Sequence, residues 1–334
     1  MTLAPLNSAD LTVRGLTTTF DTGRGVAVAA ADVDIDVAPG EVVGLVGESG
    51  SGKSVTLRSI MRLIREPGKV TGRVEWGGRN LVAMGDEELR SLRGNEIAMI
   101  FQEPMTALNP VLPIGLQIEE SLVSHTTMTR RERRERALEL LTLVGIPDAK
   151  RRLHEYPHQF SGGMRQRAMI AIALACSPKL LLADEPTTAL DVTIQDQILK
   201  LLLELRDRLA MSMILVTHDL GVVAGTCDRM AVMYAGRIVE TGGVIDVFGK
   251  PHHPYTRGLL GSVPHGRAVR TMLASIDGTP PSLTALPEGC AFHPRCSYAT
   301  DICRSRRPPL EEVARGRRAA CFHHEQVAAL ETVL

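Results

Sequence analysis

The sequence has few aromatic residues and no excess of charge of either sign. Phe, Trp and Tyr make up 3% of its 334 residues, and there is a single Trp. Lys and Arg number 38, and Asp and Glu also number 38, so the formal net charge is zero. A protein that binds nucleic acid usually carries a basic excess. The composition therefore argues against nucleic acid as a partner.

Long hydrophobic runs and export signals are also lacking. The longest apolar run, residues 168–176, is far too short to span a bilayer, which takes roughly 20 residues. The first ten residues contain no basic segment followed by an apolar core, so we expect no signal peptide. Any role at a membrane is therefore expected to depend on partner proteins.

The six cysteines are unevenly placed along the chain, and no C-x-x-C pair occurs among them. In a chain without an export signal the compartment is expected to be reducing, which favours metal ligation over disulfides for clustered thiols. The spacing of the C-terminal cluster matches neither common zinc sites nor ferredoxin runs. Three alternatives stay open for this cluster: it binds a single tetrahedral ion, it binds a cubane cluster, or it binds no metal. The nearby His293, His323 and His324 keep zinc possible as the single ion. The clustered cysteines are Cys290, Cys296, Cys303 and Cys321.

Residues 47–54 carry the phosphate-binding pattern G-x-x-x-x-G-K-S. The apolar run before it, 42–46, predicts a buried strand, and residues 55–64 predict a helix. Its glycines allow backbone N–H groups to turn around an anion, and the helix amino end adds a positive dipole. Lys53 can reach the β- and γ-phosphates, and Ser54 can hold Mg²⁺. The expected phosphate-binding residues are Gly47, Glu48, Ser49, Gly50, Ser51, Gly52, Lys53 and Ser54.

Further apolar runs alternate with helical patterns, which predicts an α/β fold with functional residues at the carboxyl ends of strands. The run 180–183 ends in Asp184 and Glu185, a pattern that holds Mg²⁺ opposite a phosphate-binding loop. Glu185 is a candidate general base for water. Gln102 and His218 also follow predicted strands, although a single strand-end Gln or His is more often structural.

Residues 114–177 have a helical pattern. Within it, Thr129 and Glu132 fit a capping box, and the charged run 130–136 is mixed in sign, which favours a solvated helix face over a nucleic-acid patch. Ser161 precedes two glycines and is expected to cap a helix whose amino end is either a second anion site or an ordinary capped end. Phe20 ends a predicted strand, where it can stack on adenine or simply belong to the core.

In this order the motifs resemble those of the ATP-binding subunits of ABC transporters. The resemblance implies a P-loop NTPase cassette with a RecA-like α/β core, an antiparallel β subdomain and a helical subdomain at about 114–177. It covers about residues 8–265 and leaves residues 266–334 as a Cys-rich C-terminal extension. The residues that carry it are the phosphate-binding loop, Gln102, the signature 160–167, the run 180–185, Ala189-Leu190-Asp191 and His218.

The resemblance also implies roles for individual residues. Ser54, Gln102 and Asp184 would serve Mg²⁺, while Glu185 would polarise the attacking water. His218 would contact the γ-phosphate, and Phe20 would stack on adenine, although the family more often has Tyr there. ATP would close two subunits over each nucleotide, because only the closed state makes both sets of contacts. The residues expected to face the opposite subunit's nucleotide or the shared interface are Ser161, Gly162, Gly163, Met164, Arg165, Gln166 and Asp191.

Within the superfamily the chain looks like the ATPases of oligopeptide and dipeptide importers, often called the D subunit. Residues 99–110, the Met-Arg-Gln-Arg form of the signature and residues 253–260 carry this likeness. It implies a peripheral protein at the cytoplasmic face of the membrane. The implied partners are two transmembrane permease subunits, a second ATPase of a different sequence and an extracytoplasmic solute-binding protein.

Alternatives to peptide import stay open on the sequence. Relatives carry nickel or other small solutes, and a soluble ABC ATPase without a transport role is an alternative of another class. The phosphate-binding loop and the signature each occur once, which speaks against that last class. The tail resembles the C-terminal segment of the importer ATPases, where some members hold a 4Fe–4S cluster. The resemblance therefore favours that cluster at the four clustered cysteines, with zinc as the alternative.

Overall fold

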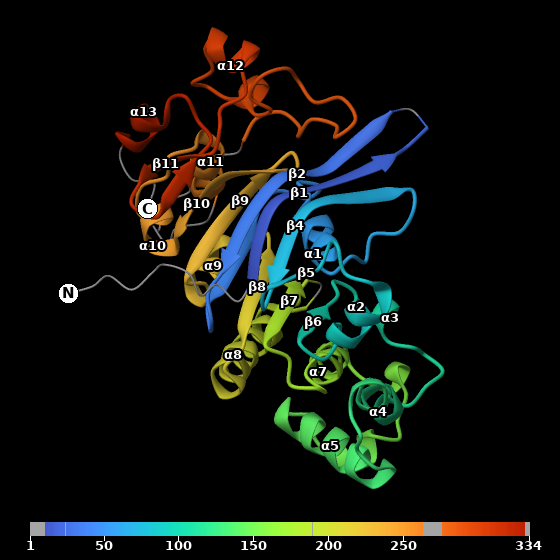
Figure 1. Cartoon of the computed structure of the whole chain (residues 1–334). Coiled ribbons are helices and arrows are strands. Elements are labelled where there is room, and N and C mark those ends of the chain that lie inside the picture. The colour runs from blue at the N-terminus through green and yellow to red at the C-terminus, as the bar shows by residue number, and fades with distance from the viewer. Residues whose placement is uncertain (1–10, 24, 189, 263–275, 331–334) are drawn as a thin grey trace, which may run out of the picture. The chain divides into compact units, whose positions relative to one another are not determined.

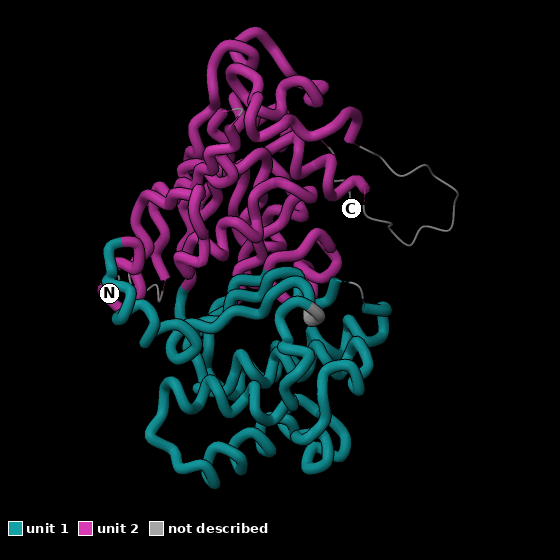
Figure 2. The backbone as a smooth tube through the Cα atoms, turned by 90° about the vertical axis from the view of Figure 1, so that its right-hand side faces the viewer, with its two compact units in different colours: residues 1–8, 38–41, 83–215 teal, residues 9–37, 42–82, 216–334 magenta. Residues whose placement is uncertain are grey.

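The computed structural model describes residues 11–23, 25–188, 190–262 and 276–330 (Figure 1). The described chain divides into two compact units, which are coloured separately in Figure 2. Unit 1 contains residues 38–41 and 83–215, and unit 2 contains residues 11–37, 42–82 and 216–330. The predicted ends of the ATP-binding domain, residues 8 and 265, lie outside the described residues, as does Ala189. Those domain boundaries stay predictions.

A four-stranded antiparallel sheet forms one layer of unit 2. Its strands lie in the order β2–β1–β4–β5, and Leu11 pairs with Val37 on one side and with Trp76 on the other. Alternate side chains of β1 are buried, as the alternating pattern of its sequence predicts for a half-buried strand. The strand predicted at Phe20 is confirmed as β1. The bounds are β1 Leu11–Asp21, β2 Val26–Val37, β4 Gly68–Trp76 and β5 Arg79–Asn80.

A second set of strands in unit 2 lies in the order β11–β12–β10–β9–β3. The pair β3–β9 is parallel and the remaining pairs are antiparallel. Every residue of β3 is buried, which explains its continuous apolar sequence. The bounds are β3 Val42–Val46, β9 Arg229–Tyr234, β10 Arg237–Gly243, β11 Glu311–Ala314 and β12 Arg317–Ala319.

The C-terminal extension shares a hydrophobic core with the rest of unit 2. Phe292 is buried beside Tyr234 and Tyr255, with ring centroids 5.2 and 5.5 Å away. These contacts join residues far apart in the sequence, so the extension is packed onto the core that Tyr234 and Tyr255 form. The helices of unit 2 are α1 Lys53–Ile60, α9 Leu220–Thr226, α10 Val244–Gly249, α11 Pro254–Gly261, α12 Asp301–Ser305 and α13 His324–Ala328.

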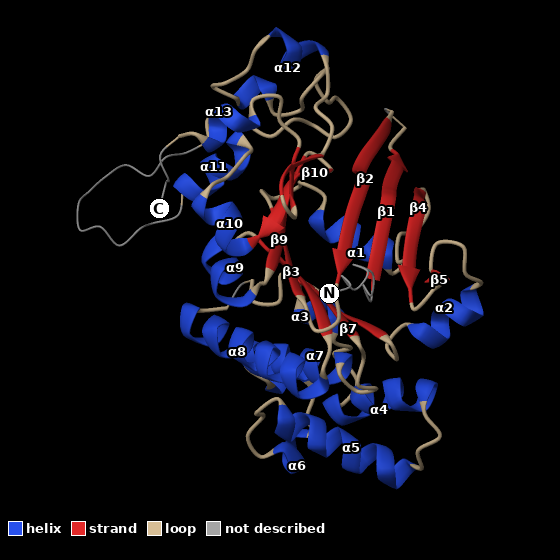
Figure 3. Cartoon of the chain, turned by 60° about the vertical axis from the view of Figure 1, so that its left-hand side comes forward, coloured by secondary structure: helices blue, strands red, loops and turns tan. Residues whose placement is uncertain are grey.

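Unit 1 places a parallel strand pair beside a group of helices. Ile97 of β6 pairs with Leu180 of β7, and Ile100 pairs with Ala183, so the two strands end at the same level. Helices α4 to α7 fill the predicted helical stretch 114–177 and pack on one another (Figure 3). The capping box of Thr129 and Glu132 is confirmed. The bounds are α2 Asp86–Leu92, β6 Ile97–Ile100, α3 Pro104–Ala107, α4 Ile114–His125, α5 Arg130–Leu143, α6 Ala149–Arg152, α7 Gly162–Ala173, β7 Leu180–Asp184 and α8 Val192–Leu209.

One helix differs in length from the sequence prediction. Helix α1 ends at Ile60 and not at residue 64, because Arg62 takes a left-handed backbone conformation with φ of 48°. Strand β8, Ser212–Thr217, begins in unit 1 and ends where unit 2 resumes. Among the described residues, none of the helices is long and apolar enough to cross a membrane.

Candidate functional site

The loop between β3 and α1 has the strand–loop–helix setting that its sequence predicted, and its glycines are required by close backbone contacts. Gly47 has φ of 153°, and a Cβ there would lie 2.2 Å from the carbonyl oxygen of Met233. Gly52 has φ of 107°, and a Cβ there would lie 2.2 Å from the carbonyl oxygen of Ala29. Backbone oxygens cannot move aside cheaply. Larger residues at Gly47 or Gly52 would therefore distort the loop.

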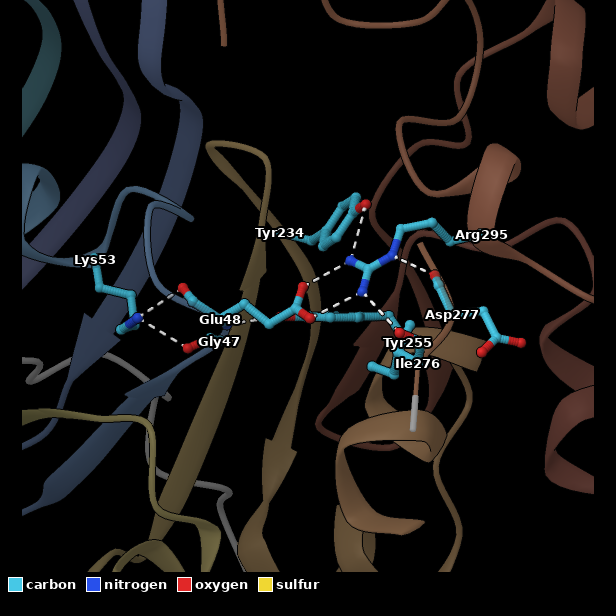
Figure 4. Close-up of polar contacts among 8 residues, drawn as sticks. All are labelled: Gly47, Glu48, Lys53, Tyr234, Tyr255, Ile276, Asp277 and Arg295. Atoms are coloured by element: carbon cyan, nitrogen blue, oxygen red, sulfur yellow. Dashed lines mark hydrogen bonds and ion pairs between the residues drawn. The ribbon is translucent and has the colours of Figure 1, made fainter. Parts of the chain in front are cut away.

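Lys53 lies inside this loop. Its side chain is buried, and Nζ donates hydrogen bonds to the carbonyl oxygens of Gly47 at 2.8 Å and Glu48 at 2.9 Å (Figure 4). The hydroxyl of Ser51 is buried and has no hydrogen-bond partner among the described residues. The described residues also provide no side-chain cap for the amino end of α1. A buried hydroxyl, a lysine and uncapped N–H groups around one loop fit a phosphate anion.

Glu48 is anchored from two further segments of unit 2. Its N–H donates to the hydroxyl of Tyr255 at 2.8 Å. Its carboxylate accepts two hydrogen bonds from the guanidinium of Arg295, at 2.7 and 2.9 Å. Sequence reasoning missed both residues, and the only available signal was that Tyr255 and Arg295 lie in stretches typical of the importer ATPases.

In unit 1, the residues that follow β6 and β7 meet. Gln102 comes two residues after the end of β6, and Glu185 directly follows β7. Nε2 of Gln102 donates a hydrogen bond to Oε2 of Glu185 at 3.3 Å. Asp184 is completely buried. Gln102 and Glu185 therefore meet at one sheet edge, a contact that the sequence analysis did not predict, and a buried acid beside them has the carboxylate chemistry that suits Mg²⁺.

Glu185 has an unusual backbone. Its φ is 47°, in the left-handed region that non-glycine residues seldom adopt. The hydroxyl of Thr188 donates a second hydrogen bond to Oε2, at 2.8 Å. A left-handed residue held by surrounding contacts is often found at a functional site. The hydrogen bonds from Gln102 and Thr188 together fix the position of Oε2.

His218 and Phe20 lie in unit 2 with the phosphate-binding loop. His218 follows β8 and is exposed. Phe20 is half-buried on β1, where it pairs with Ala27 of β2 and Gly68 of β4. The suggested contact of His218 with a γ-phosphate and the stacking of Phe20 on adenine stay predictions.

The signature residues open α7 in unit 1. The hydroxyl of Ser161 accepts a hydrogen bond from the N–H of Met164 at 3.3 Å, which confirms the predicted N-cap. Ser161 and Gly162 are exposed, whereas Gln166 is buried. Asp191 caps α8 in the same way, through the N–H of Ile194 at 3.0 Å, and is itself exposed. The exposed capping residues leave both helix starts accessible to a partner surface.

Gly163, Met164 and Arg165 complete the first turn of α7. A Cβ on Gly163 would lie 3.0 Å from Cγ2 of Ile194, so this turn packs closely against α8. Nε of Arg165 donates to the carbonyl oxygen of Pro157 at 2.9 Å, and the side chain thereby holds the preceding segment. Their predicted contact with an opposite nucleotide stays a prediction.

The four clustered cysteines of the extension line one small cavity of about 10 Å³, roughly the space of one water molecule. All four are free thiols. Burial raises the pKa of Cys290 and Cys296, and it raises that of Cys321 to about 12. Within the described ranges, no group of three or more His, Cys, Asp or Glu side chains is arranged to hold a metal ion. The donors suit a metal, but the cavity as it stands is too small for a cubane cluster, so the thiols would have to separate to hold one.

Comparison with known proteins agrees with this geometry. The ABC transporter family profile matches residues 30–188, and the profile of the oligopeptide/dipeptide transporter C-terminal region matches residues 239–303. A probable peptide ABC transporter ATP-binding protein of Sinorhizobium fredii, y4tR, is 53% identical over 96% of this chain and 96% of its own length. The oligopeptide transport ATP-binding protein OppD of Escherichia coli is 49% identical over 93% of this chain and 92% of its own length.

A solved structure supports the fold independently. The dimeric post-hydrolysis state of the ATP-binding cassette MJ0796, bound to ADP and Pi, aligns with a TM-score of 0.63 at 31% identity. The alignment covers 70% of this chain and 98% of that one. The fold and the loop together define an ATP-binding cassette. The chain belongs to the oligopeptide and dipeptide transport ATP-binding family of ABC proteins.

Proposed function

We propose that this chain hydrolyses ATP to drive a membrane importer of di- and oligopeptides. The observation that carries the proposal is the similarity to peptide-transport ATP-binding proteins, which extends over almost the whole chain and includes the C-terminal region. The geometry of the loop and of the strand-end acids supports ATP as the substrate. The chain would work as a peripheral protein at the cytoplasmic face of the membrane.

The loop residues would bind the phosphates in unit 2. The backbone of residues 47–52 would surround them, and Lys53 would turn from the carbonyl oxygens of Gly47 and Glu48 towards the β- and γ-phosphates. Ser54, Gln102 and Asp184 would hold Mg²⁺. When bound, the ion neutralises charge on the phosphate oxygens. Phe20 would support the adenine.

Glu185 would orient the attacking water and accept its proton. Its carboxylate is suited to this role because Gln102 and Thr188 donate to one oxygen, Oε2, and so fix its direction. His218 would contact the γ-phosphate. A positioned general base contributes about 10²- to 10⁴-fold to a rate.

The exposed start of α7 would act on the nucleotide of a second ATPase subunit. Residues 161–166 would approach its γ-phosphate, and Asp191 would lie at the same interface. ATP would favour the closed pair, because only closure adds these contacts to those of the loop. Two permease subunits, a second ATPase of different sequence and a solute-binding protein would complete the importer.

The Glu185→Gln variant tests the catalytic assignment. We expect it to bind MgATP as tightly as the wild type and to lose at least about 100-fold in turnover. Glu204→Gln, in the C-terminal half of α8, is the control and should keep full turnover. Unchanged hydrolysis by Glu185→Gln would refute the assigned role.

Purification from native membranes tests the transport assignment. A tagged chain should co-purify with two polytopic subunits, a second ATPase and a solute-binding protein, and the purified complex in vesicles should take up labelled peptide with ATP. Uptake of nickel or another small solute without peptide would move the assignment to the first alternative. Recovery only from the soluble fraction would support a non-transport ATPase.

We also propose that Cys290, Cys296, Cys303 and Cys321 bind a 4Fe–4S cluster, with zinc as the alternative. What supports this is that all four free thiols line one cavity. Such a centre would hold the extension together. Iron and sulfide assays on anaerobically purified protein should give both elements. Zinc without sulfide would exclude the cluster, and the absence of all three would exclude a metal.

A further inference from the structure

The contact between the C-terminal extension and the phosphate-binding loop joins residues far apart in the sequence. Arg295 lies in the short turn between Cys290 and Cys296, and its side chain is 4% exposed. Glu48 is the second residue of the loop, and its side chain is 27% exposed. The two form a bidentate ion pair in unit 2, shown in Figure 4. Planar, paired hydrogen bonds of this kind fix direction as well as distance.

The guanidinium of Arg295 is held on every side. Nε donates to the carbonyl oxygen of Asp277 at 2.9 Å, and one terminal nitrogen donates to that of Ile276 at 3.3 Å. The other terminal nitrogen also donates to the hydroxyl of Tyr234 at 3.4 Å. The hydrogen bond with Glu48 is the main cause that raises the pKa of Arg295 above its ordinary value. A cation held by five hydrogen bonds on an aromatic core forms a rigid support for the carboxylate it binds.

The turn that carries Arg295 is fixed by backbone hydrogen bonds of the extension. The N–H of His293 donates to the carbonyl oxygen of Cys290 at 3.0 Å, and the N–H of Cys296 donates to that of His293 at 3.2 Å. The N–H of Cys290 donates to the carbonyl oxygen of Cys303 at 2.8 Å. The position of the guanidinium is therefore set by the same backbone that brings the thiols to one cavity.

Glu48 is held at three points, and the proposed role of Lys53 would change one of them when a nucleotide binds. Its carbonyl oxygen accepts from Lys53, its N–H donates to Tyr255, and its carboxylate accepts from Arg295. If Lys53 turns towards phosphates, the loop loses the first contact. The contacts with Arg295 and Tyr255 would then keep the loop in its shape. The loop would therefore not have to lose conformational entropy when ATP binds.

We propose that Arg295 is a positioning residue that holds the phosphate-binding loop, through Glu48, in the shape that receives ATP. The C-terminal extension would thereby set the ATP affinity of the cassette. The inference rests on the proposed ATPase function, since a positioned loop matters only if it binds phosphates. Arg295 would act on binding more than on chemistry, because the strand-end acids of unit 1 do not depend on it.

The test measures MgATP affinity, KM and kcat of full-length variants. Arg295→Met should weaken MgATP binding and raise KM by about 5- to 10-fold, the size of a typical coupling between contacting residues, while kcat stays within about twofold. Arg295→Lys keeps the charge but loses the paired geometry, and should fall between Arg295→Met and the wild type. Arg306→Met, an exposed arginine of the same extension, is the matched control.

A double-mutant cycle with Glu48→Gln separates positioning from a general loss of stability. If the two residues act as one contact, the double variant should bind MgATP no more weakly than the worse single variant. Additive effects, or wild-type affinity in folded Arg295→Met, would overturn the inference. Should Arg295→Met fail to fold, Arg295→Lys and Glu48→Gln decide by the same criterion. If the wild-type chain has no affinity for MgATP, both the proposed function and the inference are wrong. If Glu185→Gln traps ATP but Arg295→Met binds MgATP as tightly as the wild type, only the inference is wrong.

Discussion

The amino ends of α1 and α7 are built differently, although both are expected to meet a phosphate group. Helix α1 begins after Gly52, which has a left-handed backbone, and the buried Lys53 closes the loop in front of it. Helix α7 begins after Ser161, whose hydroxyl already caps the first turn, and Ser161 and Gly162 are exposed. The first end is enclosed within its own unit and suits a ligand bound there. The second end presents a capped surface, which suits a ligand brought by another subunit.

Among the changes that test this difference between α1 and α7, removal of the Lys53 side chain should have the largest effect on MgATP affinity. Lys53→Ala removes the cation that would meet the phosphates, and it also removes two hydrogen bonds within the loop. We expect MgATP affinity to fall by about 100-fold or more, with hydrolysis lost, because charged hydrogen bonds in an enclosed site are strong. Lys150→Ala, at an exposed position of α6, is the control. Isothermal titration gives the affinity, and a loss below threefold would show that the loop does not bind through Lys53.

A matched pair of glycine substitutions sharpens the comparison. Gly52→Ala places a Cβ 2.2 Å from a backbone oxygen at positive φ, whereas a Cβ on Gly162 would meet its nearest atom, Cδ2 of Leu190, at 3.7 Å. We expect Gly52→Ala to lower the free energy of unfolding by at least about 2 kcal/mol and Gly162→Ala to leave it within about 0.5 kcal/mol. Denaturant unfolding measures both. Equal losses would show that the two helix starts are equally constrained.

The same two regions show what local sequence determines. The strand–loop–helix setting of the loop follows from the pattern 47–54, and two of the contacts of Lys53 are local, to the carbonyl oxygens of Gly47 and Glu48. The N-cap of Ser161 and the capping box of Thr129 were also predictable, since each involves residues three positions apart. The sequence also predicted that Gln102 and Glu185 follow strands, but their hydrogen bond depends on the pairing of β6 with β7, which no local pattern encodes.

Contacts between distant segments could not be predicted in this way. The pairing of β12 with β10 and the burial of Phe292 against Tyr234 depend on the folded chain, and no spacing in the sequence encodes them. The ion pair of Arg295 with Glu48 belongs to the same class. The left-handed backbone of Glu185 was also missed, because an acid after a strand gives no sign of its φ angle. The sequence therefore predicted the motifs, but it did not predict the contacts from distant segments that hold the motif residues in place.

Loss of the α7 cap should separate binding within the chain from action on the partner. Ser161→Ala removes the hydroxyl that accepts from Met164, and we expect it to lower the free energy of unfolding by about 1 kcal/mol. The MgATP affinity of the isolated chain should be unchanged, while ATP turnover of the assembled importer should fall. Ser124→Ala, on the exposed side of α4, controls for loss of a helix hydroxyl. Weaker binding by isolated Ser161→Ala would contradict the division of roles between α1 and α7.

The smallest effect is expected from the loss of the hydrogen bond that Thr188 donates to Glu185, in the same unit as α7. Thr188→Val keeps the volume of the side chain but removes the shorter of the two hydrogen bonds to Oε2 described above, 2.8 Å against 3.3 Å from Gln102. A hydrogen bond of this kind contributes about 1 kcal/mol, which corresponds to a roughly fivefold fall in kcat if the carboxylate must point at the water. MgATP affinity should stay at the wild-type value, because the loop lies in unit 2. Thr142→Val, on the exposed face of α5, is the control. A fall in affinity with unchanged kcat would show that Thr188 supports nucleotide binding, and the separation between a binding loop and a strand-end base would then be wrong.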